Sequence, residues 1–68
     1  MEREPVTSSN IESIGYEDGT LEVEFKGGGV YQYQEVPAEV HTRLMAAPSA
    51  GRFLGQEVKG KFDCQRVE

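Results

Sequence analysis

Cysteine, histidine and tryptophan are nearly absent from this chain: its 68 residues hold one cysteine, one histidine and no tryptophan. The single cysteine, Cys64, cannot form an intrachain disulfide, and such cysteine usage is typical of a reducing compartment. The sequence also shows no long apolar run and no apolar leader. We therefore expect a cytoplasmic protein without a membrane partner, and we assign no role to Cys64.

Side chains that could carry catalysis or bind metal are equally scarce. His41 and Cys64 lie far apart and cannot supply the three or four ligands that zinc requires, so we predict neither metal nor cofactor. His41 follows Val40 on a predicted helix and should face its rim or the solvent, and no nucleophile can be paired with it. The sequence thus predicts that the protein is not an enzyme, and an enzymatic function is the least favoured alternative.

Positive charge is in the minority, with seven Lys and Arg against twelve Asp and Glu and a formal net charge of −5. Taken as a whole, this balance argues against a protein that binds nucleic acid or anionic membranes. The charges are unevenly placed, however, because residues 1–24 contain seven acidic side chains and one basic one, whereas residues 43–66 contain five basic and two acidic ones. A mixed, solvated surface is the simplest interpretation.

A chain of this length can form one small core. We predict a single domain over residues 6–62, with flexible termini at residues 1–5 and 63–68. Cores of this size leave only about 3–5 kcal/mol of net stability, so self-association as a homodimer is an alternative source of stability.

Two turn signals divide the first half of the chain into three strands. Asp18 and Gly19 predict a two-residue hairpin turn, which pairs Tyr16 with Leu21 and places their apolar neighbours on one face. Residues 21–25 alternate between apolar and acidic, as expected of a strand with one buried face and one face in water.

The length of the glycine turn at residues 27–29 decides where the next side chains point, because a shift of one residue reverses every side chain of a strand. A three-residue loop pairs Phe25 with Tyr31 and Val23 with Tyr33, and it directs both tyrosine rings into the core. The glycine run precedes no helix or lysine, so a hairpin turn is favoured over a phosphate-binding loop.

A four-residue loop beginning at Lys26 would instead turn both tyrosines outward, where they could stack on bases. It would also bury Gln32 and Gln34 at a cost of about 1–3 kcal/mol each, and we therefore favour the three-residue loop. The face opposite the core is then predicted to be polar, acidic and exposed. Its residues are Ser13, Gly15, Glu22, Glu24, Val30, Gln32 and Gln34.

The second half of the chain predicts two short helices. Residues 37–47, with Pro37 in the first turn, carry an apolar stripe that begins at Val40. Pro48 ends this helix, and Ser49 is a suitable N-cap for the next. The apolar residues of the second helix are spaced four apart and are Leu54, Val58 and Phe62. The sequence thus predicts an α+β fold, a three-stranded antiparallel β-meander with two short C-terminal helices packed on one face.

Several motifs, taken in this order and spacing, resemble the KTSC domain family over residues 6–62. They are Ser8-Ser9-Asn10-Ile11, Ile14-Gly15-Tyr16, Leu21-x-Val23-x-Phe25, Tyr31-x-Tyr33-x-x-Val36-Pro37, Leu44 and Ser49-x-Gly51-x-Phe53. The family occurs at the C-terminus of some lysyl-tRNA synthetases and as short standalone bacterial and phage proteins. The resemblance therefore implies RNA as an alternative to a protein partner. Residues 56–61 are less basic here than in similar members.

The start of the second helix is the best candidate binding site in the sequence. Ser49, Gly51 and Arg52 would bring a hydroxyl, free backbone N–H groups and a guanidinium to one helix terminus, which can hold a phosphate or carboxylate. An ordinary N-cap with a solvated arginine is the simpler interpretation. Further cations that could lie nearby are Arg43, Lys59 and Lys61.

We therefore predict a small non-enzymatic binding or interaction module with a protein or RNA partner. In the RNA-binding alternative, the basic second helix contacts phosphates.

Overall fold

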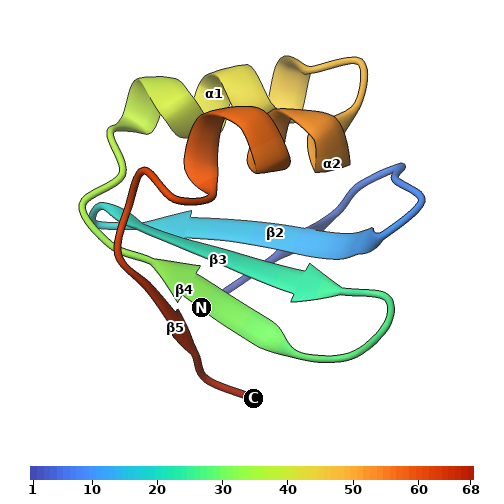
Figure 1. The fold of residues 1–68 in the computed structure, drawn as a ribbon, viewed down its shortest axis with the longest axis horizontal. Helices are drawn as coiled ribbons and strands as arrows, with labels where there is room; N and C mark the ends of the chain where they lie inside the picture. The colour runs from blue at the N-terminus through green and yellow to red at the C-terminus, as the bar shows by residue number, and fades with distance from the viewer.

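The computed structural model describes all 68 residues and contains one antiparallel sheet whose strands follow one another in chain order (Figure 1). The strands are β1 (Glu4–Pro5), β2 (Ile11–Glu17), β3 (Thr20–Phe25), β4 (Val30–Tyr33) and β5 (Cys64–Arg66). The helices are α1 (Ala38–Ala46) and α2 (Ala50–Phe53), and α2 continues into the π-helical turn η1 (Leu54–Val58). Figure 1 shows all the helical segments on the same side of the sheet.

The α+β class and the antiparallel sheet are confirmed, but the prediction of three strands is wrong because the sheet has five. β1 pairs with β2, and β5 pairs with β4, so each added strand closes one edge of the predicted meander. Residues 1–5 and 63–68, which we expected to be flexible, contain these two strands. Both are short, exposed and without apolar alternation. They form because an edge strand offers unpaired N–H and C=O groups with which another segment can pair. These groups belong to the neighbouring strand, so the sequences of β1 and β5 themselves do not predict the pairing.

The first hairpin has the predicted register, with Tyr16 opposite Leu21. Asp18 and Gly19 have φ angles of 50° and 84°, the left-handed conformations that a two-residue turn of this kind requires. A β-bulge lies between Ile11 and Ser13. The extra residue turns Ile11 toward the core, where it is fully buried.

The second hairpin is displaced by two residues from the predicted register. Tyr31 lies opposite Val23 and Tyr33 opposite Leu21, so the predicted pairing of Phe25 with Tyr31 is wrong. A displacement of two residues keeps each side chain on its face, since side chains alternate with a period of two. Both tyrosines therefore lie on the helix-covered face, as the sequence predicted.

The glycine run explains this displacement. The loop consists of Lys26 to Gly28, and the Phe25 N–H closes it by donating to the Gly29 carbonyl at 3.1 Å. Gly28 and Gly29 have φ angles of 108° and 94°, which glycine adopts without the strain that other residues would suffer. Because three adjacent glycines can serve either loop, the local sequence does not select one register.

The face opposite the helices was predicted to be exposed to water, and this prediction is wrong because the N-terminal segment covers it. Glu22 on this face is only 7% exposed. Arg3 Nη1 donates to Glu22 Oε2 at 2.6 Å, and the Gln32 side-chain amide donates to Glu22 Oε1 at 2.8 Å. A Cβ atom on Gly15 would lie 2.5 Å from the Glu2 carbonyl oxygen, so glycine is what allows this close approach.

The core lies between the helices and the sheet. Its buried residues are Ile11, Ile14, Leu21, Val23, Tyr33, Val36, Leu44, Ala50, Leu54 and Val58. None of the helices has the length and apolar composition needed to cross a lipid bilayer.

Both helices are shorter than predicted. Pro37 is the N-cap of α1 and lies before its first turn. The Ser49 hydroxyl caps α2 as predicted, accepting a hydrogen bond from the Arg52 N–H at 3.2 Å. The second helix does not reach Phe62, because Lys59 is extended and Gly60 has a φ of 79°. The buried apolar stripe of this helix thus consists of Leu54 and Val58, and Phe62 lies outside the helix.

Candidate binding groove

The site residues predicted from the sequence do not form one cluster. Ser49, Arg52 and Phe53 line a hollow of about 230 Å³, and the Arg43 guanidinium lies 5.3 Å from the centre of the Phe53 ring. Gly51 faces elsewhere, since a Cβ atom on it would overlap the side-chain oxygen of Asn10. This glycine lets α2 pack against the turn at residues 8–10, where the Ser8 hydroxyl accepts the Ile11 N–H.

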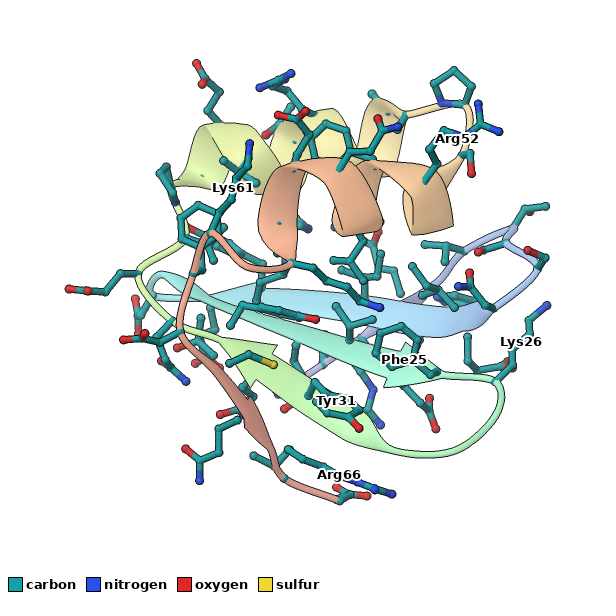
Figure 2. The ribbon with its side chains drawn as sticks, viewed as in Figure 1. Phe25, Lys26, Tyr31, Arg52, Lys61 and Arg66 are labelled. Carbon is teal, nitrogen blue, oxygen red and sulfur yellow. The ribbon has the colours of Figure 1, made fainter.

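The two predicted lysines lie at the far end of the helical layer. Figure 2 shows Lys61 and Arg52 at opposite ends of this layer. Lys61 is exposed beyond the end of η1. The Lys59 ammonium lies 5.5 Å from the centre of the Phe25 ring and belongs to a different site.

That site is a groove of about 450 Å³ between the sheet and the chain that follows η1. It lies where the helical layer ends. Beyond this end, the part of the sheet face that β4 and β5 form is not covered by helices. Tyr33 on this face is 3% exposed, whereas Tyr31 is only half-buried. The residues that line the groove are Phe25, Gly28, Tyr31, Tyr33, Lys59, Gly60 and Cys64.

Two aromatic rings in the groove are flanked by cations. Phe25 and Tyr31 meet edge to face, with ring centres 5.5 Å apart and planes at 80° (Figure 2). Lys59 lies over Phe25, and the Arg66 guanidinium carbon is 5.8 Å from the centre of the Tyr31 ring. A cation at such distances from a ring face is attracted by its quadrupole. The groove therefore offers two ring surfaces and two positive charges together.

Secondary structure brings both cations to this place. Arg66 is opposite Tyr31 in the register of β5 on β4, so the two side chains share one face. The Lys59 N–H donates to the Leu54 carbonyl at 2.9 Å, five residues back, in the wide turn of η1. Such π-helical turns are frequent at functional sites. Here the turn leaves Val58 in the core and Lys59 over the groove.

Tyr33 and Cys64 are neighbours at one end of the groove. They are opposite each other in the β4–β5 register, and both line the groove. Burial raises the pKa of the Tyr33 hydroxyl to about 12, and the neighbouring Cys64 side chain adds to this shift. The Tyr33 hydroxyl thus keeps its proton at neutral pH.

His41 has a packing partner. Its ring stacks on Tyr16 with centres 4.8 Å apart and planes at 7°, and the Tyr16 hydroxyl donates to the Val36 carbonyl. Nowhere in the structure do three or more His, Cys, Asp or Glu side chains form a group that could hold a metal ion.

The groove was not predicted from the sequence because β5, which supplies Cys64 and Arg66, was not predicted. The available signal was the Tyr31-x-Tyr33 motif, which we assigned to the core alone. Tyr33 does lie in the core, but Tyr31 lies at the open margin of the same face.

Five strands, a helical layer on one face and an open aromatic groove at its margin define a small α+β domain. The chain belongs to the KTSC domain family, whose profile matches residues 7–62, and the resemblance drawn from the motifs is confirmed. A crystal structure of a KTSC domain protein from Yersinia pestis is 46% identical, with a TM-score of 0.94 over 98% of this chain and 97% of that one.

Two kinds of relative match this chain. A protein of Tsukamurella paurometabola is 48% identical over 61 residues, which cover 87% of this chain and 91% of the relative. A lysine–tRNA ligase of Nostoc punctiforme is 39% identical over 61 residues, which cover 87% of this chain and only 11% of the ligase. The domain is thus similar both to short proteins and to a segment of a much longer enzyme.

Proposed function

We propose that this chain is a non-catalytic binding module that holds single-stranded RNA in the aromatic groove. One observation carries the proposal: Phe25 and Tyr31, with Lys59 and Arg66 beside their rings, line or border one open groove. Proteins that bind single strands combine aromatic rings, on which bases stack, with cations that follow the phosphates.

The local charge of the groove supports an anionic ligand. Lys59 lines it and Arg66 borders it, and its lining contains no Asp or Glu. The net charge of −5 is therefore not the charge that a ligand would meet in the groove. Acidic residues such as Glu22 lie instead on the opposite face of the sheet.

The size of the groove supports a single strand over a duplex. A volume of about 450 Å³ is within the range of pockets that hold one small ligand, comparable to a single nucleotide. Unpaired bases can leave their stack and enter such a site, whereas the bases of a duplex are held in place.

The relatives add an associational argument for RNA. Lysine–tRNA ligases of Nostoc punctiforme and Trichormus variabilis each match this chain over 11% of their own length, at 39% identity. A domain joined to an enzyme that acts on tRNA has RNA close at hand. This argument supports RNA as the ligand class but says nothing about which residues bind it.

The groove is a better site for RNA than the start of α2. The Ser49 hydroxyl there already accepts the Arg52 N–H, and Phe53 is the one aromatic residue that lines the hollow beside it. Lys59 is the one residue of the predicted set that lines the groove.

The test is fluorescence anisotropy with labelled single-stranded RNA of mixed sequence, about ten nucleotides long, at about 50 mM salt. We expect Tyr31→Ala and Lys59→Gln each to weaken binding by at least about fivefold, because they remove a stacking surface and a phosphate contact. Arg52→Gln removes the same charge outside the groove. A larger loss for Arg52→Gln than for Lys59→Gln would place the ligand at the start of α2.

Circular dichroism would show whether each variant is folded. If the folded wild-type chain bound no RNA under these conditions, the proposal would be wrong, and a protein would be the partner to seek.

A further inference from the structure

The two aromatic rings of the groove form a corner. The planes of Phe25 and Tyr31 meet at 80°, and the ring centres are 5.5 Å apart. Bases that are stacked on one another have parallel planes, so a stacked pair cannot lie flat on both of these rings. A single base can lie parallel to one ring and place its edge against the other. The shape of the corner therefore favours one base over a stacked pair.

The two cations of the groove belong to different rings of this corner. The Lys59 ammonium lies over Phe25, and the Arg66 guanidinium lies over Tyr31. In Figure 2, Tyr31 lies between Phe25 and Arg66. Lys59 comes directly after η1, whereas Arg66 belongs to the edge strand β5. The positive charges thus reach the corner from two separate elements, one beside each ring.

Both cations are available to a phosphate. The ion pairs of the structure both involve Arg3, so neither Lys59 nor Arg66 is paired with a carboxylate. The Arg66 Nε donates to the Glu68 carbonyl at 2.9 Å, and the two terminal nitrogens of this guanidinium make no hydrogen bond within the protein. A guanidinium held in this way can offer both terminal nitrogens to two oxygens of one phosphate.

We propose that the groove holds one nucleotide through the phosphates on both sides of its ribose, so that the shortest complete ligand is a nucleoside 3′,5′-bisphosphate. This inference rests on the proposed RNA function and deepens it. Every internal nucleotide of an RNA strand carries one phosphate on its 5′ oxygen and one on its 3′ oxygen. With the base in the corner of Phe25 and Tyr31, one phosphate lies at Lys59 and the other at Arg66.

The experiment compares small nucleotides by NMR chemical-shift titration of the isotope-labelled chain at about 50 mM salt. The ligands are adenosine 3′,5′-bisphosphate, adenosine 5′-diphosphate and the 3′- and 5′-monophosphates of adenosine. The 5′-diphosphate has as many phosphates as the bisphosphate, but both are on one side of the ribose. We expect the bisphosphate to bind at least about threefold more tightly than each of the others, the effect of one further exposed ionic contact.

Three variants test the assignment of the phosphates to these cations. Lys59→Gln and Arg66→Gln should each lower the affinity for the bisphosphate to about that of a monophosphate, because one phosphate then lacks its cation. Arg52→Gln removes a charge outside the groove and is the matched control, which should keep the wild-type preference.

Four results would overturn the inference. Equal or tighter wild-type binding of the 5′-diphosphate would reject contact on both sides of the ribose and leave the proposed RNA function standing. A preference for the bisphosphate that persists in both Lys59→Gln and Arg66→Gln would assign the phosphates to other groups. Binding of the ten-nucleotide RNA without binding of any of these nucleotides would show that one nucleotide is not the complete ligand. Failure of the folded wild type to bind RNA or nucleotides would reject both the proposed function and the inference that rests on it.

Discussion

Glu22 is a carboxylate almost enclosed by a small domain, and its partners explain why it is tolerated there. The Gln32 amide donates to one of its oxygens and Arg3 to the other. The hydrogen bond from Gln32 lowers the pKa of Glu22 below its usual 4.5, burial acts in the opposite direction, and Arg3 lowers it further. Buried charges persist where they are hydrogen-bonded and paired in this way.

This lowered pKa predicts a loss of stability in acid. The unfolded chain takes up a proton near the usual pKa of 4.5, while the folded carboxylate resists protonation. Glu22 therefore stabilises the fold above pH 4.5, and this contribution disappears as the pH falls through the lower pKa of the folded state. Urea denaturation across this range should show a smaller acid loss for Glu22→Gln than for the wild type.

Glu12→Gln, at an exposed position of β2, is the control for this measurement. Equal acid sensitivity of Glu22→Gln and the wild type would contradict the role assigned to the Arg3–Glu22–Gln32 group.

Tyr31 and Tyr33 show how two residues of one motif can differ in role. Both lie on the helix-covered face, as the alternation of side chains predicted. The alternation of side chains does not indicate, however, where the helical layer ends. The extent of this layer decides that Tyr33 is buried in the core and that Tyr31 is only half-buried in the groove.

At the level of elements, the terminal strand β5 is the largest departure from the prediction. Beyond β5 itself, the Val67 N–H donates to the Val30 carbonyl at 2.7 Å, and the Val30 N–H donates to the Glu68 carbonyl at 3.1 Å. These bonds extend the pairing to the end of the chain. They hold Arg66 opposite Tyr31 and so contribute to the groove.

Val67→Pro tests this pairing, because proline has no N–H to donate to Val30. We expect it to lower the free energy of unfolding by about 1 kcal/mol relative to Val67→Ala, which keeps the N–H. Urea denaturation of both variants is the measurement. Identical curves would mean that this end of the chain is not paired with β4 in solution.

The hairpins show which turns a sequence can define. Asp18 and Gly19 fit one two-residue turn, and the predicted register of β2 and β3 is confirmed. The run of three glycines fits more than one turn, and the register of β3 and β4 was predicted two residues away from its true position. The correct face was still obtained because the error was an even number of residues.

The molecule as a whole is acidic, but the proposed site is locally basic. Lys59 and Arg66 are the cations at the groove, whereas Arg43 and Arg52 lie toward the other end of the helical layer. The salt dependence of RNA binding should therefore reflect about two phosphate contacts.

For a single strand this corresponds to a slope of about −1.4 in log K against log salt, or about a sevenfold loss of affinity between about 50 and 200 mM salt. Anisotropy titrations at several salt concentrations would measure it, and Arg66→Gln should make the slope shallower by about 0.7. A slope several times steeper would show that cations outside the groove also contact the RNA.

The sequence by itself determined the α+β class, the first hairpin, the face of each tyrosine and the family. These features depend on local signals, namely side-chain alternation, a turn dipeptide, helix caps and ordered motifs. The tertiary structure alone decided the second register, the cover of the outer face by the N-terminal segment, the strand β5 and the groove. Those depend on backbone edges and packing between segments distant in sequence, which no local pattern of residues encodes.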